Sequence, residues 1–101
     1  MFLAMNRFRI ARGKEDDFVQ MWRERDSHLA SVPGFVRFHL VRGASNDEYT
    51  LFASHTEWAS EADFEAWTQS DAFRLAHANA GKGARDMYMG PPQLELFESV
   101  I

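Results

Sequence analysis

The chain has 101 residues, of which 46% are hydrophobic and 26% are charged, and this suits one globular domain over residues 1–101 and excludes a disordered tail. Its net charge of −4 argues against nucleic acid as a partner, because phosphate binding needs clustered positive charge. The lack of cysteine excludes disulfides and thiolate chemistry and suits a cytoplasmic protein, and no apolar run approaches the roughly 18 residues that a membrane span needs.

The first segment, residues 2–10, alternates with period two, and this predicts a strand. One face of this strand is apolar except for a single residue in its middle, Asn6. The apolar members of that face are Phe2, Ala4, Phe8 and Ile10.

Residues 14–31 show the spacing of an amphipathic helix, with three carboxylates in the first turn that complement the helix dipole. The Pro-Gly pair at 33–34 ends this helix and turns the chain. Strands are predicted over residues 35–42 and 49–57. Because a polar loop joins them, they are expected to form an antiparallel pair.

Two serines mark the second helical stretch. Ser60 is its expected N-cap, Ser70 predicts a fresh start within it, and Gly81 is its expected end. Residues 82–92 then form a long loop, and residues 93–101 form the last strand.

The order of these elements is strand, helix, strand, strand, helix, strand. It indicates the α+β class and the ferredoxin-like layout built on a split βαβ unit. In that layout the helices cover one face of the sheet, so Leu3 and Met5 on the other face would be left bare. Burial of apolar surface is favourable, and we therefore predict a homodimer that packs sheet against sheet.

Asn6 is the first candidate for a functional site. A carboxamide in an apolar strand face costs about 1–3 kcal/mol if it stays unpaired. It therefore either bonds a nearby backbone group or water, or points into a pocket and binds a ligand.

His77 lies on the apolar stripe of the second helical stretch, together with Phe73, Ala76 and Ala80. The small neighbours leave room for a flat aromatic ligand. A lone histidine does not suit zinc, which needs three or four ligands, but one axial histidine suffices for haem. The alternative is a hydrogen-bonded, partly buried histidine. Trp67 either packs in the core or shapes the same pocket sterically, since indole does not ligate iron.

Several of these residues together resemble a known family. Asn6-Arg7, Pro33-Gly34-Phe35, and Trp67 followed by Ser70-Asp71-Ala72-Phe73 and Ala76-His77 are similar to the IsdG-type haem-degrading monooxygenases of the antibiotic biosynthesis monooxygenase superfamily. The resemblance covers essentially the whole chain and implies a dimeric α+β barrel. It also implies that haem is both substrate and cofactor. The haem would be consumed with O₂ and electrons from a reductase, leaving free iron and a linear tetrapyrrole.

The resemblance implies a role for each matching residue. His77 would be the axial ligand of the haem iron, Asn6 would hydrogen-bond oxygen bound on the distal side, and Trp67 would press the porphyrin out of plane. The further haem-binding residues that we expect are Trp22, Arg25 and Phe73. Arg25 either pairs with a haem propionate or forms an ion pair on the helix surface.

Two other functions stay open on the sequence alone. One is a cofactor-independent monooxygenase that acts on polycyclic aromatic substrates in the same pocket. The other is a dimer that binds haem without degrading it.

Overall fold

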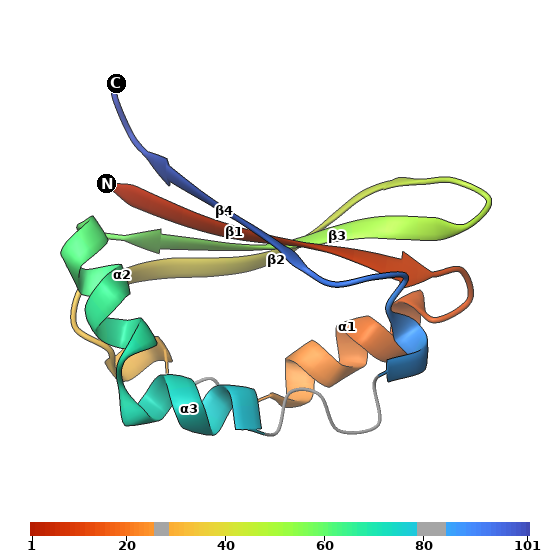
Figure 1. The fold of residues 1–101 in the computed structure, drawn as a ribbon, viewed down its shortest axis with the longest axis horizontal. Helices are drawn as coiled ribbons and strands as arrows, with labels where there is room; N and C mark the ends of the chain where they lie inside the picture. Colours follow the sequence, from red (N-terminus) through yellow and green to blue (C-terminus); the bar gives the residue numbers. More distant parts are fainter. Residues whose placement is uncertain (26–28, 79–84) are drawn as a thin grey trace.

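The computed structural model describes residues 1–25, 29–78 and 85–101, and of residues 76–78 and 85 it describes the backbone alone. Figure 1 shows two layers, with the strands in one and the helices together on one side of it. Within the described residues, no helix combines the length and apolarity needed to cross a membrane. The elements are β1 (Phe2–Ala11), α1 (Glu15–Glu24), a 3-10 turn (Leu29–Ser31), β2 (Phe35–Ser45), β3 (Tyr49–Trp58), α2 (Glu61–Thr68), α3 (Asp71–Ala78), a second 3-10 turn (Arg85–Met87) and β4 (Gln93–Glu98).

The four strands form one sheet in the order β2-β3-β1-β4, and every neighbouring pair is antiparallel. The first strand of the chain therefore lies inside the sheet, with β3 on one side and β4 on the other. This arrangement confirms the predicted α+β, ferredoxin-like layout.

The helix-facing side of the sheet carries two separate apolar cores. The Trp58 core consists of Phe2, Ala4, Leu29, Trp58 and Phe64. The Phe18 core consists of Phe8, Ile10, Phe18 and Phe52. Between the two cores lies a polar row in which Asn6 of β1 is paired with Ser54 of β3. Because α2 contributes Phe64 and α1 contributes Phe18, the helices are anchored at opposite ends of the sheet.

The first helix is shorter than the sequence predicts. Apolar spacing predicts a helix over residues 14–31, whereas α1 ends at Glu24 and Arg25 has an extended backbone. The next residues in the sequence are Asp, Ser and His, which have low helix propensity. Arg25 consequently lies at the end of a helix and not along its side.

The β2–β3 hairpin is longer than predicted. β2 continues to Ser45 instead of ending at Arg42, and a bulge shifts the register between these two residues. The side-chain oxygen of Asn46 accepts hydrogen bonds from the backbone N–H groups of Glu48 and Tyr49. This Asx turn closes the hairpin within three residues. Residues 43–45, which were predicted to belong to the loop, are therefore part of β2.

The Pro-Gly turn forms where the sequence predicts it. The N–H of Phe35 donates to the carbonyl of Val32 over 3.2 Å, and Gly34 has a φ of +83°. These features define a type II turn, which favours glycine at that position. A Cβ at Gly34 would also collide with the side chain of Asp63. The turn therefore fixes where β2 begins.

Two serines cap the helices of the second half, as predicted. Ser60 Oγ accepts from the N–H of Asp63 over 3.2 Å, and Ser70 Oγ accepts from the N–H of Phe73 over 3.1 Å. The predicted restart at Ser70 is thus confirmed, and it divides the stretch into α2 and α3.

The C-terminal segment departs in part from its prediction. The predicted helix end at Gly81 lies outside the described residues. The predicted loop over residues 82–92 contains a 3-10 turn, after which Tyr88 forms an isolated bridge with Ile10. β4 ends at Glu98, so the predicted strand over residues 93–101 is too long.

We expect Phe18→Ala to lower the free energy of unfolding by about 3–5 kcal/mol. Phe18 is fully buried, and its ring packs against those of Phe8, Phe52 and Tyr88. Urea unfolding followed by circular dichroism measures the change. Gln20→Ala, at an exposed position of the same helix, is the control and should stay within about 0.5 kcal/mol. Equal effects of the two substitutions would contradict the packing of α1 on the sheet.

Candidate functional site

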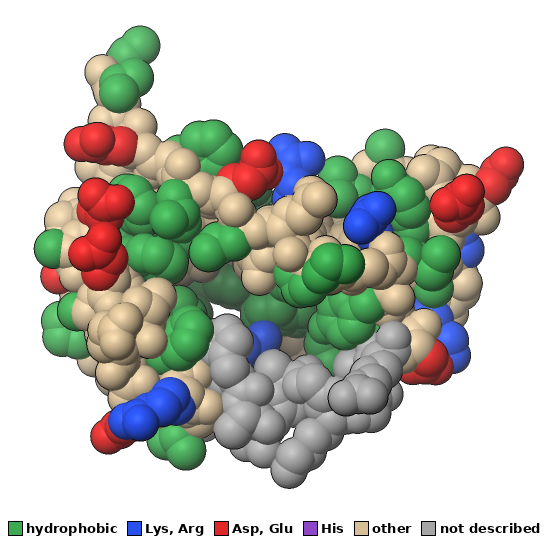
Figure 2. Space-filling model, viewed as in Figure 1, with side chains coloured by type: hydrophobic (Ala, Val, Ile, Leu, Met, Phe, Trp, Pro, Cys, Tyr) green, Lys and Arg blue, Asp and Glu red, His purple; other side chains and the backbone are tan. Residues whose placement is uncertain are grey.

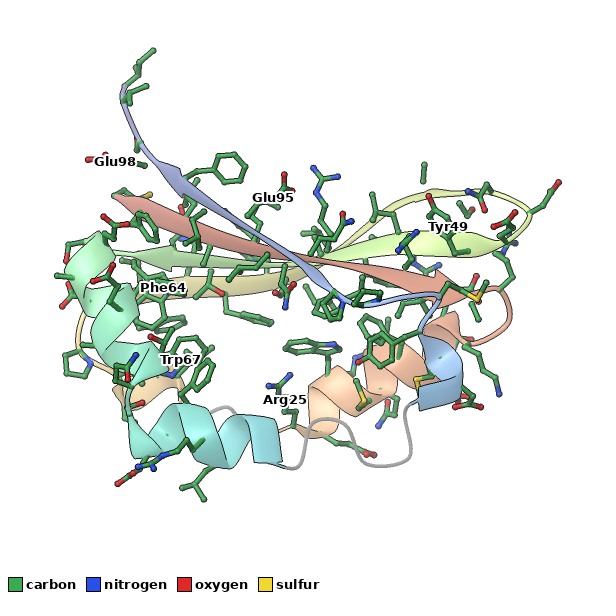
Figure 3. The ribbon with its side chains drawn as sticks, viewed as in Figure 1. Arg25, Tyr49, Phe64, Trp67, Glu95 and Glu98 are labelled. Carbon is green, nitrogen blue, oxygen red and sulfur yellow. The ribbon has the colours of Figure 1, made fainter. Side chains whose placement is uncertain are left out.

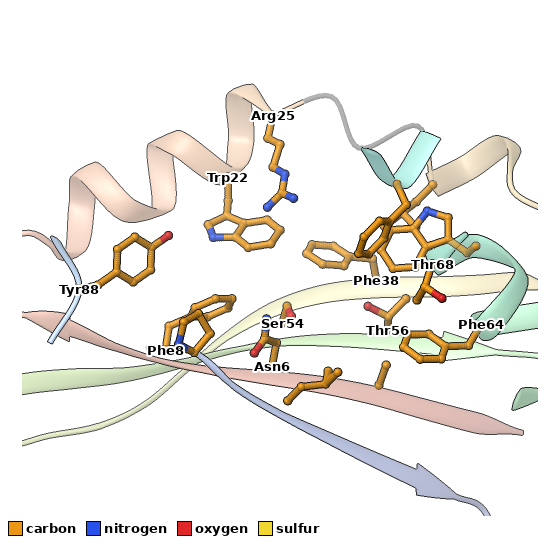
Figure 4. A pocket seen from close by; sticks show the side chains of 16 residues that line it. Asn6, Phe8, Trp22, Arg25, Phe38, Ser54, Thr56, Phe64, Thr68 and Tyr88 are labelled. Carbon is orange, nitrogen blue, oxygen red and sulfur yellow. The ribbon is translucent and has the colours of Figure 1, made fainter. Parts of the chain in front are cut away.

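A cavity of about 460 Å³ lies between the sheet and the helices. Figure 2 shows the surface hollowed there, and Figure 4 shows the cavity from close by. This volume is in the range of pockets that take small organic ligands. The lining residues are Ala4, Asn6, Phe8, Trp22, Arg25, Leu29, Phe38, Ser54, Thr56, Phe64, Trp67, Thr68, Phe73, Tyr88, Pro92 and Leu94.

The residues that the sequence predicts for the site converge on this cavity. Those that line it are Asn6, Trp22, Arg25, Trp67 and Phe73. His77 belongs to α3, but its side chain lies outside the described part of the chain. The chemical roles assigned to all six stay predictions.

Asn6 lies on the cavity floor, in the polar row between the two cores (Figure 4). Its Oδ1 is buried and has no hydrogen-bond partner among the described residues. An unpaired buried acceptor costs about 1–3 kcal/mol, and the sheet could have avoided this cost with an apolar residue. The arrangement is typical of a polar group reserved for a ligand.

Trp67 forms one wall of the cavity and is held there by other rings. Its indole lies 5.3 Å from that of Trp58 and meets the ring of Phe73 edge-on at 4.8 Å. Ser70 Oγ donates to the backbone carbonyl of Trp67 over 2.6 Å, which ties the end of α2 to the start of α3. Trp67 therefore packs on the Trp58 core and also lines the cavity (Figure 3), and its steric role toward a ligand stays a prediction.

Arg25 extends from the end of α1 into the cavity (Figure 3), rather than along the helix surface. Its guanidinium lies 4.4 Å from the centre of the Trp22 ring, and its Nε is buried without a hydrogen-bond partner among the described residues. Burial lowers the pKa of Arg25, and the charge interaction with Tyr88 partly offsets this. Burial likewise raises the pKa of Tyr88. A half-buried cation of this kind favours an anionic group on the ligand.

Several lining residues were not predicted from the sequence. Phe38 stacks on Trp22, with ring centres 5.5 Å apart and an angle of 22° between the planes. Ser54 shares the inward face of β3 with Thr50 and Thr56, so it does not stand out from its strand as Asn6 does, and only its pairing with Asn6 marks it. Tyr88 belongs to residues 87–89, which on the sequence either cap a pocket or pack, and it reaches the cavity beside its bridge to Ile10.

Comparison with known proteins identifies the family. The model of the antibiotic biosynthesis monooxygenase family matches residues 1–79. The chain belongs to this family. The family is one of monooxygenases, which confirms the prediction of an enzyme.

Haem-degrading proteins are among the relatives of this chain. A haem-degrading monooxygenase of Shouchella clausii is 29% identical over 98 residues, which cover 97% of this chain and 89% of that protein. A staphylobilin-producing haem oxygenase of Staphylococcus haemolyticus is 30% identical over 81% of this chain and 78% of that protein. The solved structure of the haem degrader MhuD from Mycobacterium tuberculosis, with two haems bound in its active site, matches with a TM-score of 0.75 and 26% identity over 100% of this chain and 97% of that one. These similarities confirm the resemblance predicted from the sequence.

We expect Ser70→Ala to lower the free energy of unfolding by about 1 kcal/mol, because it removes the N-cap of α3. It should also change the near-ultraviolet circular dichroism, since Ser70 joins Trp67 to Phe73. Ser60→Ala removes the cap of α2 and is the matched control, with a similar loss of stability. Identical near-ultraviolet spectra for the two variants would contradict the specific link between Ser70 and Trp67.

Proposed function

We propose that the protein degrades haem. It binds haem in the cavity, opens the macrocycle with O₂ and electrons from an external reductase, and releases iron and a linear tetrapyrrole. The observation that carries this proposal is the convergence of the predicted residues on one cavity bordered by α3, the helix that contains His77. The similarity to haem-degrading relatives supports it.

The residues present fit a haem. The macrocycle is flat and apolar, which suits a cavity walled by rings such as the stacked pair of Trp22 and Phe38. Its propionates suit Arg25, whose buried Nε has no hydrogen-bond partner among the described residues. A neutral polycyclic aromatic would leave this cation uncompensated. Arg25 therefore favours haem over the cofactor-independent alternative.

Three residues of the chain would have different roles in the reaction. Bound haem would supply the iron at which O₂ is activated. His77, a residue of α3, would hold the haem iron through its imidazole. Asn6 would donate from its carboxamide to developing negative charge, without acting as a strong acid. Trp67, braced by Trp58 and Phe73, would provide the rigid contact that bends the macrocycle.

Aerobic turnover of haemin tests this function. With ascorbate or a reductase, the protein should lose its Soret band and release iron, and mass analysis should find an open-chain tetrapyrrole. His77→Ala should abolish the Soret shift seen when haemin is titrated. Asn6→Ala should keep haem binding and lower turnover by about 10²–10³-fold, as for the loss of one donor to developing charge. His39→Ala, at an exposed position outside the cavity, is the matched control for the histidine variant.

Two results would each contradict the proposal. A Soret band that persists under reductant and air indicates a protein that binds haem without degrading it. Haemin that leaves the spectrum unchanged, together with oxygenation of a polycyclic aromatic, indicates the cofactor-independent monooxygenase.

We also propose that the protein is a homodimer. The helices cover one face of the sheet (Figure 1), and the opposite face exposes an apolar side chain from each outer strand. Val41 of β2 is 42% exposed and Phe97 of β4 is 45% exposed, and both are paired with outward-facing residues of the inner strands. The same face also carries the ion pairs Arg7–Glu95 and Arg37–Glu57, and burial of its apolar side chains against a second copy is favourable.

Sedimentation velocity at micromolar concentration tests the dimer. The unaltered chain should sediment as a dimer, and Phe97→Glu should shift it toward the monomer because it places a charge in the interface. Leu75→Glu, at an exposed position on α3, is the control and should remain dimeric. A monomeric unaltered chain would rule out the dimer.

A further inference from the structure

The floor of the cavity carries a polar pair, of which the proposed function uses one member. Asn6 of β1 and Ser54 of β3 are directly opposite each other in the sheet, and both line the cavity. Figure 4 shows the two side chains next to each other on the floor. Ser54 is 8% exposed, so its side chain is largely shielded from water.

Serine is an unfavourable choice for this position on folding grounds alone. Its neighbours on the inward face of β3 are buried too: Phe52 and Trp58 are apolar, and Thr50 and Thr56 carry hydroxyls but are β-branched, which suits a strand better than serine does. A buried hydroxyl costs folding free energy unless it forms a hydrogen bond. The position therefore favours a function for the hydroxyl.

The register of the sheet sets Ser54 apart as the neighbour of Asn6. On its other side, Asn6 is paired with Leu94 of β4, which offers no polar side-chain atom. Thr56, the next inward-facing residue of β3, is paired with Ala4. The side-chain hydroxyl placed directly against the carboxamide is thus that of Ser54.

We propose that Ser54 is the positioning residue for Asn6. Its hydroxyl donates to Oδ1 of Asn6 when ligand fills the cavity, and this fixes the carboxamide with its N–H groups toward the reacting centre. Directly opposed side chains have Cβ atoms about 4.5–5.5 Å apart, so rotation about χ1 brings the two groups within hydrogen-bond range. Oδ1 has no other partner among the described residues, and a hydroxyl can donate to it.

This inference rests on the proposed function, because Asn6 needs an orientation only if it acts on bound haem. It predicts that Ser54 contributes to the rate of the reaction and not to the binding of haem. A misoriented donor leaves the contact of haem with the cavity walls intact, but it weakens an interaction that matters during the reaction. Loss of the hydroxyl should therefore lower kcat and leave KM unchanged.

The pair of variants Ser54→Val and Ser54→Thr tests the role, since the two side chains have nearly the same shape and only threonine keeps the hydroxyl. Both should bind haemin as the unaltered chain does. Ser54→Val should lower kcat by about 2- to 10-fold, the range expected for one hydrogen bond, and Ser54→Thr should restore it. Ser54→Ala repeats the test without added bulk.

Thr50→Val is the matched control. It removes a buried hydroxyl from the same face of β3, but that hydroxyl donates to Glu15 away from the cavity. Its kcat should equal that of the unaltered chain.

A double-mutant cycle distinguishes positioning from a direct role. In the Asn6→Ala background, Ser54→Val should have no further effect on kcat, since no carboxamide remains to be oriented. An undiminished effect there would overturn the positioning role, as would equal kcat values for the valine and threonine variants. If the unaltered chain does not turn over haem, the proposed function fails and this inference fails with it.

Discussion

The separation of the two apolar cores is the constraint on which the site depends. Both cores lie on one face of the same sheet, and the polar row of Asn6 and Ser54 divides them. Phe18 fixes α1 over one core and Phe64 fixes α2 over the other, so neither helix packs over the row. The cavity is the space that remains between them. Close packing at the two ends thus produces an opening in the middle.

The same arrangement explains why costly polar groups survive in a mostly apolar cavity. The Oδ1 of Asn6 and the Nε of Arg25 are buried without hydrogen-bond partners among the described residues, and they face the cavity from opposite layers. Each reduces the stability of the folded chain, and anionic groups at the edge of a ligand would compensate the Nε of Arg25. Haem combines such groups with a flat apolar surface, which suits the aromatic walls.

The sequence predicts those parts of the fold that follow from local patterns. Alternation in residues 2–10 is sufficient to identify β1 and to mark Asn6, and the serine caps divide α2 from α3. The end of α1 is not predictable in this way, because the apolar stripe continues while the backbone becomes extended at Arg25. The position of Tyr88 depends on pairing with Ile10, which is distant in sequence, so no local pattern reveals it. Ser54 carries no such signal, since Thr50 and Thr56 lie on the same face of β3, and only the register with β1 places it opposite Asn6.

The central claim is that haem occupies the space between the polar row and α3. A crystal structure of the chain with bound haemin measures this directly. We expect the macrocycle inside the cavity, with Asn6 and Ser54 on one side, the imidazole of His77 on the iron from the other, and a propionate at Arg25. Haemin held on the outer face of the sheet, or in the cavity with its iron ligated by a residue other than His77, would contradict the claim.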